Sequence, residues 1–226
     1  MQHKVFLSAV KILSFVFLLT CPSTFFGQSN DGQDPKAKAI LDDLSKHTKL
    51  FSTIKADFTV TIISKDKTKK PEVQKGSLQL KGDKYKLDIK GQEITSDGKT
   101  SWTFLKDNNE VQINDVDPKG NEGVSPTTIF TIYEKGYKFA FVTENATTQI
   151  IHLFPLSPDK KKFHTIKLEI DRVKKQISSF AVMMKDGSSM DYTLSSFITN
   201  TDMPDAKFTF DPKSHPGVEV VDLREH

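Results

Sequence analysis

The sequence predicts a mainly β protein, a barrel or strongly curved antiparallel sheet, preceded by one amphipathic helix. Short runs that alternate apolar and polar residues recur from Ile54 to Phe197, and turn residues separate them. A single stretch with helical spacing comes before them. Because alternation gives each strand one apolar and one polar face, we expect one side of the sheet to face the core and the other to face water.

The first 27 residues have the pattern of a secretory signal peptide. Lys4 and Lys11 precede an apolar run, Ile12–Leu19, that is too short to span a bilayer. Cleavage is expected after Gly27, so residues 1–27 would be removed and residues 28–34 would form a flexible segment. The remainder, residues 35–226, is expected to form a single exported domain.

The one cysteine of the chain, Cys21, lies in this leader and allows two interpretations. If it were lipidated, the mature N-terminus would be anchored in a membrane. Thr20 stands where a lipidation signal has a small Gly, Ala or Ser, and Pro22 follows, which favours a cysteine that is discarded with the leader. The mature chain would then have no disulfide and would rely on packing for its stability.

The first expected element is an amphipathic helix that begins at Asp34 and Pro35. Aspartate is a favoured N-cap, and proline is favoured at the first helical position. Apolar residues then recur at helical spacing and form one stripe, which consists of Ala37, Ile40, Leu41, Leu44, Leu50 and Phe51.

Eleven strand-like runs follow. Gly82-Asp83 and similar turn signals between them predict hairpins. The runs cover residues 54–62, 77–81, 84–90, 93–96, 100–105, 110–114, 137–143, 147–154, 163–171, 176–184 and 189–197. The main interruption, residues 121–134, contains Ser125-Pro126 and a helical spacing of Ile129, Phe130 and Tyr133, so a second short helix is expected there.

Composition and motifs exclude several function classes. The net charge is +3, and loss of Lys4 and Lys11 with the leader leaves 30 basic against 29 acidic side chains, so no nucleic-acid partner is expected. The sequence has no Gly-x-Ser-x-Gly, no Cys-x-x-Cys and no histidine pair at the spacing of zinc ligands. We therefore expect no catalytic residues, no cofactor and no metal.

The apolar face of the sheet allows two interpretations. It can be an ordinary filled core, as every curved sheet needs. Alternatively, the concave side is loosely filled and takes up lipid, with Met183, Met184 and Met190 as an adaptable lining. Periodicity alone does not separate these two interpretations.

Three stretches resemble a known family. The first has the sequence Ser96-Asp97-Gly98-Lys99-Thr100-Ser101-Trp102 and is followed by Glu110-Val111-Gln112. It is similar to the central signature of the LolA-like family, the periplasmic carriers of outer-membrane lipoproteins. Ser125-Pro126 with Ile129-Phe130 resembles the Pro-led lid helix of that family, and residues 205–222 resemble its C-terminal segment. The order and spacing of these stretches agree with the family from about Ala37 to Asp222.

The resemblance implies an incomplete antiparallel β-barrel of about eleven strands, with a lid of short helices over an apolar cavity. It also implies a monomeric carrier without chemistry. Such carriers take triacylated lipoproteins from an ATP-driven complex in the inner membrane, shield their acyl chains in the periplasm and release them to an acceptor at the outer membrane.

The resemblance also supplies candidate site residues. For the cavity wall they are Phe58, Val60, Leu78, Leu80, Tyr85, Leu87, Trp102 and Phe104. For the lid they are Ser125, Pro126, Ile129 and Phe130. Periodicity adds Phe139, Phe141, Phe180 and Met183 to the cavity wall.

One position departs from the family. Where the family often has an Arg-Pro pair whose arginine bonds to the lid, this chain has Lys81-Gly82-Asp83. Lys81 is the candidate for this lid-gating role, although a lysine acts only as a point-charge donor and lacks the planar fork of arginine.

Two other functions fit the same fold. A lipidated Cys21 would make the chain an outer-membrane-anchored lipoprotein receptor. An envelope module that senses lipid and binds a regulator is the second alternative. A lipid esterase is the least favoured class, because no nucleophile motif is present.

Overall fold

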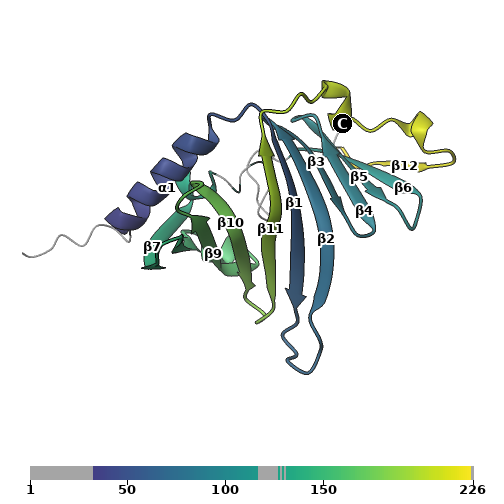
Figure 1. Cartoon of the computed structure of the whole chain (residues 1–226). Helices are drawn as coiled ribbons and strands as arrows, with labels where there is room; N and C mark the ends of the chain where they lie inside the picture. The colour runs from purple at the N-terminus through teal and green to yellow at the C-terminus, as the bar shows by residue number, and fades with distance from the viewer. Residues whose placement is uncertain (1–32, 117–126, 128, 130, 225–226) are drawn as a thin grey trace, which may run out of the picture.

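The computed structural model describes residues 33–116, 127, 129 and 131–224 of the chain. Within these residues, twelve strands form one continuous sheet that follows a single α-helix. Figure 1 shows the sheet strongly curved, with the helix lying across the part that contains β7, β9 and β10. All neighbouring strands pair antiparallel except β12, which runs parallel to β6.

The elements have the following bounds. They are α1 (Pro35–Thr48), β1 (Ile54–Ile63), β2 (Glu72–Lys81), β3 (Lys84–Ile89), β4 (Gln92–Ser96), β5 (Thr100–Leu105), β6 (Glu110–Asp115), β7 (Tyr137–Glu144), β8 (Thr148–Pro155), β9 (Phe163–Asp171), β10 (Gln176–Met184), β11 (Ser189–Thr199) and β12 (Glu219–Asp222). Short 3-10 turns lie at η1 (Ile132–Glu134), η2 (Pro158–Lys160), η3 (Asp205–Phe208) and η4 (Pro212–Ser214).

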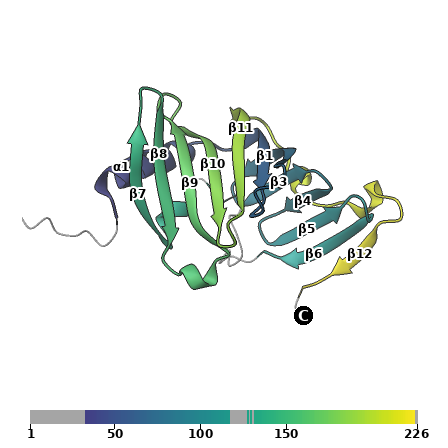
Figure 2. The ribbon, with the colours of Figure 1, turned by 90° about the horizontal axis from the view of Figure 1, so that it is seen from below.

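The sheet is open. Its strand order is β12-β6-β5-β4-β3-β2-β1-β11-β10-β9-β8-β7, and the long pairing of β1 with β11 joins its two halves. Figure 2 shows β7 and β12 at its two opposite edges. The predicted fold class, mainly β with an incomplete barrel, is confirmed. The sheet has one strand more than the sequence indicated, because β12 has four residues and is a strand only through its pairing with β6.

Helix α1 is fixed at its first residues by Asp34. Its carboxylate accepts hydrogen bonds from the backbone N–H groups of Lys36 (2.8 Å), Ala37 (3.2 Å) and Phe141 on β7 (3.0 Å). These bonds lower the pKa of Asp34, and the bond from Phe141 has the largest effect. The predicted cap at Asp34 and proline at the first helical position are therefore confirmed.

The helix ends earlier than its apolar stripe suggested. Its last residue is Thr48, and the side chain of Leu50 is 72% exposed. Phe51 still packs inward, since its ring lies 6.1 Å from that of Phe197 on β11. The predicted stripe is thus wrong at Leu50, which lies in the turn that leads into β1.

The face of the sheet that α1 covers, here called the inner face, carries the main core. Ala37, Leu41 and Leu44 of α1 are at most 2% exposed and belong to the same cluster as the inner-face side chains of β7–β10. The most completely buried of these are Ile151, Leu153, Ile166, Leu168, Ile170 and Ile177. Burial of about 25 cal/mol per Å² of apolar surface stabilises this half of the sheet.

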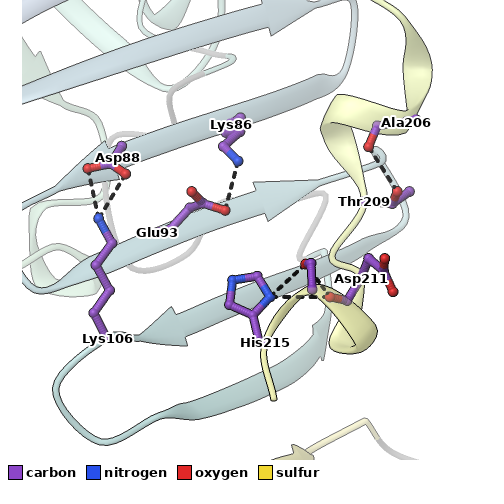
Figure 3. Close-up of polar contacts among 9 residues, drawn as sticks. Lys86, Asp88, Glu93, Lys106, Ala206, Thr209, Asp211 and His215 are labelled. Atoms are coloured by element: carbon purple, nitrogen blue, oxygen red, sulfur yellow. Dashed lines mark hydrogen bonds and ion pairs between the residues drawn. The ribbon is translucent and has the colours of Figure 1, made fainter. Parts of the chain in front are cut away.

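A second, smaller core lies on the opposite face, here called the outer face, of β3–β6. The C-terminal segment, residues 203–218, packs against it and buries Phe208 and Val111 completely. The ring of Phe104 lies 5.6 Å from that of Phe210 and 4.5 Å from that of His215. Figure 3 shows this segment beside the outward ion pairs Lys86–Glu93 and Lys106–Asp88. The sheet therefore has a core on each side.

Candidate functional site

The candidate site is a strip of apolar side chains on the inner face that are only partly buried. They pack against the main core on one side, and the strip runs across β10, β11, β1 and β3. The apolar strip consists of Phe180, Met184, Met190, Tyr192, Ile62, Tyr85, Leu87 and Ile89. Large half-buried apolar surfaces of this kind are typical of binding sites.

Stacked aromatic rings form the centre of the apolar strip. Phe180 and Tyr192, which are paired on β10 and β11, lie with their ring centroids 4.5 Å apart and their planes at 10°. The ring of Phe58 is 6.0 Å from that of Tyr192. Burial raises the pKa of the Tyr192 hydroxyl, which donates to the sulfur of Met190 at 3.8 Å. The surface is therefore uncharged here.

Methionines line one end of the strip. Met190 pairs with Ile62 on β1, and Met184 lies at the end of β10, just before the β10–β11 turn. Methionine side chains are flexible and polarisable, and they adapt to apolar ligands of varied shape. This end of the strip is therefore the part whose shape adapts most readily.

Gly76 provides the space for Phe58. A Cβ added at this position would lie 2.4 Å from Cζ of Phe58 and 2.8 Å from the carbonyl oxygen of Asp88, both far inside contact distance. Phe58 therefore lies across β2 at the border of the apolar strip. The sequence analysis missed Gly76, although an isolated glycine inside a strand often marks such a close approach.

The inner face brings together nine of the predicted cavity residues. These are Phe58, Val60, Leu78, Leu80, Tyr85, Leu87, Phe139, Phe141 and Phe180. Only Tyr85, Leu87 and Phe180 lie in the apolar strip. Phe139 is buried, and Phe141 is covered by the ammonium of Lys36, which lies 3.8 Å from its ring centroid.

Trp102 and Phe104 lie on the other face of the sheet. Ile94 of β4 pairs with Leu87 and therefore lies on the inner face. Its neighbours along the strand, Glu93 and Thr95, lie on the outer face, and they pair with Phe104 and Trp102. Their grouping with the cavity wall is corrected here, because both side chains point toward the outer face, where Phe104 packs under the C-terminal segment. Phe104 of β5 thus serves the smaller core.

Met183 also belongs to the outer face. It pairs with Thr165 and Ser189, while Val182 pairs with inner-face Ile166. Met184 is two residues after Val182 and so shares its face, where it packs against the main core. The neighbouring methionine thus takes the place that periodicity assigned to Met183.

The expected lid is described only in part. Ser125, Pro126 and Phe130 lie outside the described residues. Ile129 is 5% exposed and belongs to the main core, and η1 follows it. Glu134 of η1 accepts a hydrogen bond from Ser45 (2.6 Å) and forms an ion pair with Lys49 (2.6 Å). These bonds attach η1 to α1. They also lower the pKa of Glu134, and the bond from Lys49 has the largest effect.

Lys81 contacts the C-terminal segment. Its ammonium donates to the carbonyl oxygen of Met203 (2.8 Å) and to Asp205 (2.8 Å), which also pairs with Lys84 (2.6 Å). The two lysines lower the pKa of Asp205 to about 2, and Lys81 has the larger effect. Lys81 therefore fastens the outer-face segment. Its predicted lid-gating role stays a prediction, since Ser125, Pro126 and Phe130 lie outside the described residues.

A cleft of about 320 Å³ lies elsewhere, between α1 and the ends of β8–β10. Its lining includes Ile40, Leu44 and Ile170 together with an ion pair between Asp43 and Lys175 (3.0 Å). It shares no residue with the predicted cavity wall. Among the described residues, no group of three or more His, Cys, Asp or Glu side chains is placed to hold a metal ion. In the same part of the chain, no helix has the length and apolar character to cross a bilayer.

Three solved structures are similar to this chain, and the first of them shares its fold. An uncharacterized conserved protein from Thermus thermophilus has 14% identity and a TM-score of 0.55, with 83% of this chain and 99% of that chain covered. A putative outer membrane lipoprotein-sorting protein domain from Vibrio parahaemolyticus has 12% identity and a TM-score of 0.42, covering 76% and 97%. The lipoprotein LppX of Mycobacterium tuberculosis has 12% identity and a TM-score of 0.45, covering 76% and 100%.

Among curated proteins, none matches this chain. The model of the family described as "Outer membrane lipoprotein carrier protein LolA" matches residues 49–211, which include β1 to β11 and η3. This match covers well over half of the chain, so the protein belongs to the LolA family of outer membrane lipoprotein carriers.

Proposed function

We propose that this protein is a periplasmic carrier that holds the acyl chains of lipoproteins against the apolar strip and transports the lipoproteins from the inner to the outer membrane. The observation that carries the proposal is the partly buried row of aromatic, aliphatic and methionine side chains on the inner face. Membership of the carrier family supports the same role.

A carrier is needed because acyl chains are costly to expose to water. Each methylene kept from water is worth about 0.8 kcal/mol, so a free lipoprotein leaves a membrane only with great difficulty. The strip offers nondirectional contacts that hold a chain without fixing it. Release then needs only a competing apolar surface, which an acceptor at the outer membrane would supply.

The proposal includes an order of partners. An ATP-driven complex in the inner membrane would load the protein, and an outer-membrane acceptor would unload it. Residues 1–27 would direct export and be removed, leaving residues 35–226 as a single, monomeric domain that binds and transports without catalysis. The predicted lid residues Ser125, Pro126, Ile129 and Phe130 would cover the bound chains.

Met190→Glu tests the strip. The exported chain is mixed with a triacylated lipoprotein, and native mass spectrometry measures the one-to-one complex. A carboxylate at this half-buried position faces the ligand and is costly to bury with it, so we expect at least a tenfold loss of the complex. Thr193→Glu places the same carboxylate at an exposed position of the same strand, next to Tyr192 and on the opposite face, and this control should retain binding.

The outcome decides between functions. A lipoprotein lacking its acyl chains should form no complex with the wild-type chain. Equal binding by Met190→Glu and wild type would contradict the proposal. The mass of the exported protein also distinguishes the carrier, with Cys21 removed, from a receptor anchored through a lipidated Cys21.

A further inference from the structure

Three loops at one end of the sheet form a concentrated positive surface. They are residues 64–71 between β1 and β2, residues 156–162 between β8 and β9, and residues 185–188 between β10 and β11. Together, here called the cationic tip, they carry eight lysines and three aspartates. Their net charge of five positive units exceeds the +3 of the whole chain, so the remainder of the protein is net negative.

The loops are in contact with one another. The backbone N–H of Lys185 donates to the carbonyl oxygen of Lys162 (3.0 Å), and its ammonium donates to that of Pro158 (2.7 Å). A Cβ added at Gly187 would lie 3.9 Å from Cβ of Lys65. Figure 1 shows the β1–β2 loop and the β10–β11 turn at the same end of the molecule. The lysines therefore act as one surface.

The aspartates of two of these loops are already engaged locally. Asp66 accepts hydrogen bonds from the N–H and hydroxyl of Thr68 (3.0 and 2.7 Å), and Asp186 does the same with Ser188 (2.9 and 2.6 Å). Both carboxylates are thus held within their own turns. Lys67, Lys69 and Lys70 are exposed and belong to the same loop as Asp66, so the positive charge of this loop faces solvent.

An exposed apolar side chain lies among these lysines. Leu156 is 54% exposed and lies two residues before η2, in the loop that carries three consecutive lysines, residues 160–162. The methionine end of the apolar strip opens next to the same loops, since Met184 directly precedes Lys185 and Ile62 lies three residues before Lys65. A lysine cluster that contains an exposed apolar side chain matches the interface of an anionic bilayer.

We infer that the cationic tip docks the protein on the surface of an anionic phospholipid membrane, with Leu156 entering the interface and the methionine end of the apolar strip facing the headgroups. In this position an acyl chain passes between bilayer and strip over a short path. This orientation rests on the proposed function, but the docking itself requires no lipoprotein, so it is testable even if the proposed carrier function fails.

The test is flotation with vesicles of phosphatidylglycerol and phosphatidylethanolamine, using the exported chain without lipoprotein. We expect binding that weakens as salt rises and is absent from vesicles of phosphatidylcholine. Each lysine near an anionic surface contributes about fivefold to affinity, so K67Q, K69Q and K70Q combined should weaken binding by about 100-fold. Leu156→Ser should weaken it by about fivefold.

The matched control removes the same charge at the other end of the sheet. Lys55, Lys99 and Lys174 are exposed there, at the start of β1 and in the β4–β5 and β9–β10 turns. The combined K55Q, K99Q and K174Q variant should bind vesicles like the wild type. Equal losses in both triple variants, or no binding of the wild type to anionic vesicles, would overturn the inference. In the second case an acidic protein surface becomes the partner to examine.

Discussion

At the scale of single residues, Asp205 is the position at which two cations meet. Lys81 and Lys84 both reach its carboxylate and hold the C-terminal segment against β2 and β3. The pKa of Asp205 is about 2, below its ordinary 3.8, so the group contributes stability that is present above pH 3.8 and is lost as the pH falls through about 2.

We therefore expect Asp205→Asn to lower the urea midpoint near neutral pH, and the difference from wild type to vanish at about pH 2. High salt should reduce the difference, since these side chains are exposed. Urea titrations at several pH values measure this. A difference that is constant across the pH range would show that the ion pairs contribute nothing.

Lys81→Leu is expected to leave lipoprotein binding and release unchanged, because Lys81 contacts Met203 and Asp205 on the outer face. A reconstituted transfer assay measures this. A large loss of transfer with normal stability would restore the gating role that the family pattern suggested for this position.

Gly76 is a position at which a larger side chain should destabilise the protein. Gly76→Ala would press Cβ against the Phe58 ring and the Asp88 carbonyl oxygen, so we expect a loss of about 1–3 kcal/mol in the free energy of unfolding. Adding Phe58→Leu should recover only part of this loss, because the backbone contact remains. Ser77→Ala, next along β2 and facing outward, is the control for the substitution in calorimetry.

At the scale of elements, α1 depends on Asp34 for both its start and its attachment to β7. Asp34→Ala removes bonds to Lys36, Ala37 and Phe141, so we expect a loss of about 1–2 kcal/mol in the free energy of unfolding, measured by urea titration. Asp42→Ala removes only an exposed pair with Lys38 and should cost about 0.5 kcal/mol or less. Equal losses would mean that Asp34 does not fix the helix.

The sequence identified most elements because their signals are local. Asp34-Pro35 specifies the start of α1, and alternation specifies β1 and β3 from residues within each strand. β12 has no such signal, since it consists of four residues whose pairing with β6 arises from tertiary structure. The early end of α1 was missed because Leu50 is apolar yet lies in a turn.

At the scale of the whole molecule, the sheet separates two cores. Alternation tells which residues of a strand share a face, but it does not tell which face of one strand continues that of the next. The inner face is apolar as far as Ile94 and continues with Thr103 and Gln112 on β5 and β6. Trp102 and Phe104 were therefore placed on the wrong side, although the strand itself was correct.

Because the two cores lie on opposite faces, substitutions in them should affect stability and lipoprotein binding separately. Phe104→Ala removes the ring that packs on Phe210 and His215, so we expect a loss of about 3 kcal/mol in stability with unchanged lipoprotein binding per folded molecule. Met190→Glu should do the reverse, with a small loss of stability and a large loss of binding. Thermal unfolding and native mass spectrometry on both variants check this. Loss of binding in Phe104→Ala at a temperature where it is folded would contradict the division.

The two edges of the open sheet are both protected against pairing with strands of another copy. At β7, residues 33 and 34 occupy hydrogen-bonding groups of Phe139 and Phe141. At the other edge, β12 is short and carries Glu219 and Asp222. Short, charged or occupied edges resist strand-to-strand association between copies. An open sheet of this size can thus remain dispersed at high concentration and avoid growing into fibrils.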